Sequence, residues 1–136
     1  MNRFLISLVQ ASSEIIHGAK IARRLKALRQ MTIEDDDGDI SSDSMRSFFE
    51  FLSRYPRCKY PEITLTPDGE IYARWKGPEN SLFSIHFLFK SRLHYVLFAP
   101  DRKRPDIMDR LSATASVDTV LEIADRAYEI ADWVTE

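Results

Sequence analysis

The chain has few of the residues that cross-link a protein or anchor it in a membrane. Its 136 residues include one cysteine, and no apolar run is longer than a few positions. One cysteine excludes an internal disulfide and favours a reducing compartment, so we expect a cytoplasmic protein. Runs this short predict no membrane-spanning helix, which needs about 20 apolar residues. The apolar stretch 4–9 is also too short for a signal peptide.

Neither sign of charge dominates. A net charge of −2 argues against broad nucleic-acid binding, and the length predicts a single domain over residues 1–136. The charges are nevertheless uneven: residues 1–30 carry six bases and one acid, whereas residues 105–136 carry eight acids and two bases. The two ends either compensate each other in the fold, which we favour, or steer a partner.

The sequence is also poor in catalytic patterns. It contains no G-x-S-x-G, no H-E-x-x-H and no phosphate-binding glycine-rich loop. Cys58 lies between two basic residues that favour its thiolate, but no histidine is placed beside it. The acidic loop 34–39 resembles a calcium-binding loop, yet Ile33 and Ser44 occupy two positions that require carboxylates. We therefore predict no catalytic residues, no metal site and no cofactor.

Apolar residues at three- and four-residue spacing predict three helices. The first covers about residues 5–29, where Gly18 allows a break because glycine weakens a helix. The second begins near Ser42 or Ser44 and ends at Pro56. The third follows Ser116 and continues to residue 134, whereas residues 106–111 suggest only a short helical turn.

Alternating apolar and polar residues between the second and third helices predict four antiparallel strands. The sequence Thr66-Pro67-Asp68-Gly69 has proline and glycine where a hairpin loop needs them. The resulting register places Glu62 opposite Arg74 and separates an apolar face from a polar one. Further along, alternation places residues 83, 85, 87 and 89 in the core. The predicted fold is α+β: two N-terminal helices, a four-stranded antiparallel β-meander, and a C-terminal helix packed on the sheet.

Two groups of residues are candidates for function. On the polar face of the sheet, Tyr72, Arg74, His86 and His94 form a candidate surface patch, in which the histidines lie one diagonal apart. Two histidines are too few for a typical metal site, so half-buried sheet histidines are the simpler interpretation. On the last helix, the apolar arc is wider than one sheet requires, which makes three residues candidate partner contacts: Ile123, Ile130 and Trp133.

The stretch Pro61–Trp75, with an apolar strand, a Thr-x-Asp-Gly turn and a strand that ends in tryptophan, resembles a family of small uncharacterised bacterial proteins. Members of that family are often encoded near toxin–antitoxin genes, and the resemblance implies no catalytic residues. The family tends to have an acid before the tryptophan, where this chain has Arg74.

Two functional hypotheses remain open. The first is a non-enzymatic protein-binding module that binds another protein or a second copy of itself, as an accessory of a toxin–antitoxin or defence system. The alternative is a small enzyme or nucleic-acid-binding protein that uses the outer face of the sheet. Neither hypothesis requires a cofactor or a membrane.

Overall fold

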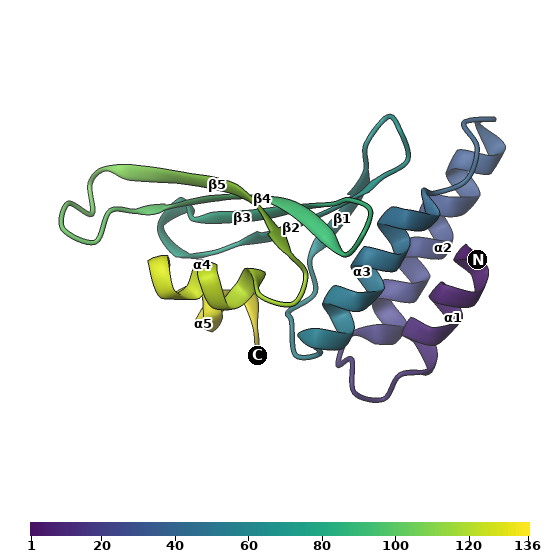
Figure 1. Ribbon diagram of the computed structural model, residues 1–136, viewed down its shortest axis with the longest axis horizontal. Helices are drawn as coiled ribbons and strands as arrows, with labels where there is room; N and C mark the ends of the chain where they lie inside the picture. Colours follow the sequence, from purple (N-terminus) through teal and green to yellow (C-terminus); the bar gives the residue numbers. More distant parts are fainter.

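A single antiparallel sheet of five strands, in the order β1-β2-β3-β4-β5, organises the chain. The computed structural model describes residues 1–136, and its helices lie along one face and at one end of the sheet (Figure 1). The α+β class is therefore confirmed. The elements are, in chain order, α1 (Asn2–Ala11), α2 (Gly18–Glu34), α3 (Ser42–Arg54), β1 (Glu62–Leu65), β2 (Ile71–Lys76), the short 3-10 helix η1 (Pro78–Asn80), β3 (Leu82–Phe87), β4 (Arg92–Pro100), β5 (Met108–Ser116), α4 (Val120–Tyr128) and α5 (Ala131–Val134).

The first predicted helix is two helices, α1 and α2, because the chain turns back over residues 12–17. Gly18 begins α2 at a point where the two helices meet closely. A Cβ at this position would stand 2.5 Å from the carbonyl oxygen of Val9, which no side chain tolerates. The glycine therefore marks the start of a new helix rather than a weak point inside a long one.

The predicted hairpin register is confirmed. β1 pairs with β2 through Glu62 and Arg74, Ile63 and Ala73, and Thr64 and Tyr72. Because alternate side chains point to opposite faces, this register gives the sheet one buried face. That face is covered by α3, whose Phe51 ring lies 5.9 Å from the Trp75 ring.

Ser44 joins α3 to the middle of the sheet. Its side chain is completely buried, and its Oγ donates to the carbonyl of Phe87 at 2.7 Å. The same Oγ accepts from the backbone N–H of Ile71, also at 2.7 Å. One hydroxyl therefore satisfies a buried backbone group on each of two strands. The helix itself is capped by Ser41, one residue before Ser42 and three before Ser44, the two predicted caps.

The sheet has a fifth strand that the sequence does not predict. Residues 106–111 do not form a helical turn; β5 runs over Met108–Ser116 and pairs with β4 along its whole length. The prediction that Phe89 lies in the core is also wrong. The two-residue turn at Lys90 and Ser91 follows β3, and both turn residues have positive φ. The turn rotates Phe89 outward, where 57% of its surface is exposed.

The predicted C-terminal helix is divided at Glu129, which adopts a left-handed conformation with φ 55° and ψ 50°. The Asp125 carboxylate accepts from the N–H of Ala131 at the start of α5. Trp133 then packs on Gly77, where a Cβ would stand 2.4 Å from the ring. No helix combines the length and the apolar character that crossing a membrane requires.

Candidate functional site

The structure brings three of the four residues of the candidate surface patch into one row across the outer face. Tyr72 lies opposite His86, and His86 lies opposite His94, so the two histidines are direct cross-strand neighbours rather than diagonal ones. The rings of Tyr72 and His86 are 5.7 Å apart and tilted by 31°. All three side chains are half-buried.

Carboxylates are the side-chain partners of Arg74 and His86 in this patch. Arg74, in the next row, donates to Glu62 at 2.7 Å, as the predicted cross-strand pair requires. This hydrogen bond lowers the pKa of the Glu62 carboxyl, so the carboxylate stays ionised beside its partner. His86 Nε2 lies 3.2 Å from Glu70 Oε1, a contact that the sequence did not predict because Glu70 belongs to the hairpin loop.

Next to the patch, the outer face is hollowed. A depression of about 600 Å³ extends from Tyr72 and Arg74 across the sheet to Phe98 and Arg110. The Arg110 guanidinium lies 6.0 Å from the centre of the Phe98 ring. Sequence reasoning missed Arg110 because it placed this residue in a helical turn instead of on β5.

The outer face orients a histidine without pairing it to a nucleophile. His86 is hydrogen-bonded to Glu70 alone, and no hydroxyl or thiol contacts it in the way a catalytic serine or cysteine would. Cys58 is buried elsewhere, and burial raises the pKa of its thiol to about 12. The expectation that its basic neighbours would favour the thiolate is therefore wrong. No three His, Cys, Asp or Glu side chains come close enough together to hold a metal ion.

The three residues proposed for partner contact differ in how exposed they are in the structure. Ile123 is exposed on α4, with 43% of its surface accessible. Ile130 is completely buried in the chain's own core, so it is not available to a partner. It occupies the bend between α4 and α5, which the sequence had assigned to one continuous helix. Trp133 is half-buried because its ring packs on Gly77.

The free edge of β5 is the second candidate site, and its hydrogen-bonding direction follows from the ladder to β4. The backbone N–H of Val117 donates to Ser91, and that of Asp101 donates to Ile107. The odd-numbered residues between 107 and 117 therefore direct their backbone N–H and C=O groups toward β4. Because antiparallel strands alternate, the even-numbered residues direct their N–H and C=O groups away from β4. No other strand lies on that side. The backbone groups of Arg110, Ser112 and Thr114 therefore form an open edge.

The opposite edge of the sheet is protected. β1 has only four residues and follows Pro61. The carbonyl of Ile63, which faces outward, accepts a hydrogen bond from Arg24 Nε on α2 at 3.1 Å. A short strand, a neighbouring proline and a helix against the edge are all features that prevent strand addition. The two edges thus differ: α2 covers the outer edge of β1, whereas no strand pairs with the outer edge of β5.

Comparison with known proteins gives no further guidance, because no family model, curated protein or solved structure matches the chain.

Proposed function

We propose that this chain is a non-enzymatic protein-binding module whose binding element is the free edge of β5. The observation that carries the proposal is the asymmetry of the two sheet edges. An exposed strand of nine residues offers unpaired backbone groups to another strand, and natural proteins usually block such an edge. β5 has no proline, and its central residues Ser112, Ala113 and Thr114 are uncharged.

A second copy of the chain is the partner that this edge fits best. In an antiparallel pair centred on Leu111, residue 108 faces 114 of the other copy, and 110 faces 112. All four of these positions direct their backbone groups outward, so each finds a partner. Arg110 then lies opposite Ser112, and no like charges oppose each other. The register is therefore self-complementary in its backbone hydrogen bonds.

The inner face of β5 supports the same pairing. Leu111 and Ala113 are only half-buried at the margin of the core. In the proposed register Leu111 lies opposite its own copy at a non-hydrogen-bonded position, where cross-strand side chains approach most closely. Pairing would extend the apolar layer from one copy to the other and complete the burial of this leucine.

The outer face supports the alternative hypothesis less well. An enzyme that uses His86 for nucleophilic catalysis would need a hydroxyl or thiol beside it, and the only side chain hydrogen-bonded to His86 is the Glu70 carboxylate. A phosphate-binding surface would need free cations, but Arg74 is already paired with Glu62. Of the cations beside the depression, Arg110 alone has no carboxylate partner.

Light scattering coupled to size-exclusion chromatography tests the proposal over a concentration series. We expect twice the 15.8 kDa chain mass at high concentration. Ser112→Pro removes an outward N–H and places a ring at the edge, so it should give a monomer with an unchanged fold. Ser112→Val keeps the N–H and favours a strand, so it should remain a dimer. A monomeric wild type at every concentration, or a folded Ser112→Pro dimer, would overturn the proposal.

An accessory role in a toxin–antitoxin or defence system is the wider form of this proposal, and it is supported only by the resemblance of Pro61–Trp75. Co-purification from the native host, with Ser112→Pro and Ser112→Val as paired baits, tests this role. A toxin or antitoxin retained by both variants would support the role through another surface. If neither variant retains a toxin or antitoxin, the accessory role is wrong, and the proposal of self-association is unaffected.

A further inference from the structure

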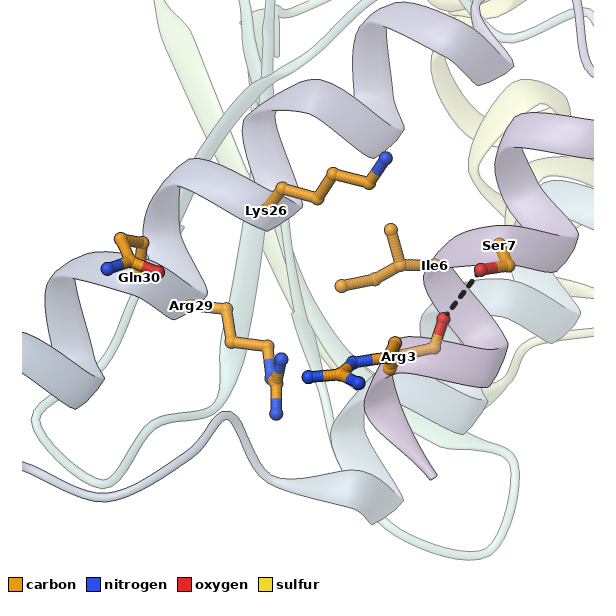
Figure 2. Close-up of a pocket in the computed structure, with 6 residues that line it drawn as sticks. All are labelled: Arg3, Ile6, Ser7, Lys26, Arg29 and Gln30. Atoms are coloured by element: carbon orange, nitrogen blue, oxygen red, sulfur yellow. Dashed lines mark hydrogen bonds between the residues drawn. The ribbon is translucent and has the colours of Figure 1, made fainter.

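A basic hollow of about 370 Å³ separates the outer surfaces of α1 and α2. Three of its six lining residues are cations, Arg3, Lys26 and Arg29, and none is an acid. Figure 2 shows the guanidinium groups of Arg3 and Arg29 facing each other from the two helices, with Ile6 beyond them and Lys26 on the far side of Ile6. Two guanidinium groups in this position repel each other unless an anion lies between them.

Arg29 is held in place for such an anion. Its Nε donates to both carboxylate oxygens of Asp39, at 2.9 and 3.2 Å. Burial by itself raises the pKa of Asp39, but hydrogen bonds from Arg29, Asn2 and Ile40 outweigh it and lower the pKa, so the carboxylate stays ionised. Because Asp39 occupies only the Nε side, the two terminal nitrogens of Arg29 remain free to donate into the hollow.

The other cations of the hollow are not neutralised. Arg3 has no carboxylate within ion-pair distance, since the six ion pairs of the chain involve other residues. Lys26 Nζ donates to the neutral Gln10 at 2.8 Å, which fixes the ammonium without removing its charge. Asp39 therefore balances one of three positive charges, and a dianion would balance the remaining two.

We propose that this hollow binds a phosphate dianion, either inorganic phosphate or the terminal group of a small phosphomonoester. Facing guanidinium groups offer paired N–H donors, which match the oxygen geometry of phosphate better than single donors do. The volume exceeds that of one phosphate and lies at the lower end of small-molecule sites. Ile6, which is almost completely buried, is the one apolar residue that lines the hollow. The site is separate from the β5 edge and does not depend on self-association.

Titration followed by backbone amide NMR shifts tests the site, with inorganic phosphate and phenyl phosphate as probes and the ionic strength held constant with chloride. We expect saturable shifts around Arg3, Ser7 and Arg29. Tighter binding of phenyl phosphate would assign the site to monoesters, and equal binding would assign it to phosphate alone. Because Arg3 has no partner to lose, Arg3→Gln should fold normally and weaken binding at least about tenfold, the loss typical of one charged hydrogen bond.

Arg23→Gln is the matched control, since Arg23 is an exposed arginine of α2 that does not line the hollow. Its affinity should stay within about twofold of wild type because only distant, screened charge is removed. Equal weakening by Arg23→Gln and Arg3→Gln would overturn the proposal in favour of diffuse electrostatics. Shifts that do not saturate would also overturn it. So would a single-stranded oligonucleotide that competes more strongly than phenyl phosphate, because the occupant would then be a nucleic-acid backbone.

Discussion

Replacing Ser44 with alanine removes the hydroxyl that connects α3 to two strands. The N–H of Ile71 and the C=O of Phe87 would each lose a 2.7 Å hydrogen bond in a site without solvent access. A buried backbone group left unpaired costs about 1–3 kcal/mol. For two such groups, partly offset by the better helix propensity of alanine, we expect Ser44→Ala to lower the free energy of unfolding by about 2–5 kcal/mol.

Urea denaturation followed by circular dichroism measures this loss. The midpoint should fall while the m-value stays the same, since the variant buries nearly the same surface. Ser53→Ala is the matched control on the same helix, because that exposed hydroxyl bonds only to Phe49 one turn earlier. The control should stay within about 0.5 kcal/mol of wild type. If Ser44→Ala matched the control, α3 would not be joined to the sheet in the way described.

Two further changes test other parts of the fold. Gly77→Ala should lower the stability by about 1–3 kcal/mol, because the new methyl group overlaps the Trp133 ring; an unchanged urea midpoint and tryptophan emission would contradict that packing. Cys58, with a pKa of about 12, should hold about one thiolate in ten thousand at pH 8. It should therefore react with a thiol reagent only after unfolding, and rapid reaction of the native protein would show that the thiol is exposed.

The β1–β2 hairpin could be predicted from the sequence because its determinants are local. Proline and glycine set the loop, and the strict alternation from Ile63 to Trp75 fixes the strand phase. The same phase correctly placed Tyr72, Arg74 and His86 on the outer face. In this region short-range chemistry and long-range pairing agree, so the sequence alone was sufficient.

β5 could not be predicted because the apolar residues of its inner face are mostly small. The inner row contains Asp109, Leu111, Ala113 and Ala115, and only one of these is a large apolar residue. Such a strand forms because β4 offers nine positions for pairing, which is information held by another part of the chain. The contact of Tyr128 Oη with the Asp109 carboxylate also depends on the tertiary fold.

The basic hollow between α1 and α2 could not be predicted from the sequence for a related reason. With residues 5–29 interpreted as one helix, Arg3 and Arg29 would lie at opposite ends of it. The turn at residues 12–17 instead brings α1 back along α2, so that the two guanidinium groups face each other. Charge counting identified the basic segment, but only the reversal of the chain gives it a concave shape.

Hydrogen exchange along β5 tests the central claim most directly, because neighbouring amides face opposite sides. Leu111 and Ala113 donate to β4 and should exchange slowly at every protein concentration. If a second copy pairs with the edge, Arg110, Ser112 and Thr114 should be protected at high concentration and lose this protection on dilution. Rapid exchange of these three amides at all concentrations, beside protected odd-numbered neighbours, would show that the edge of β5 stays unpaired.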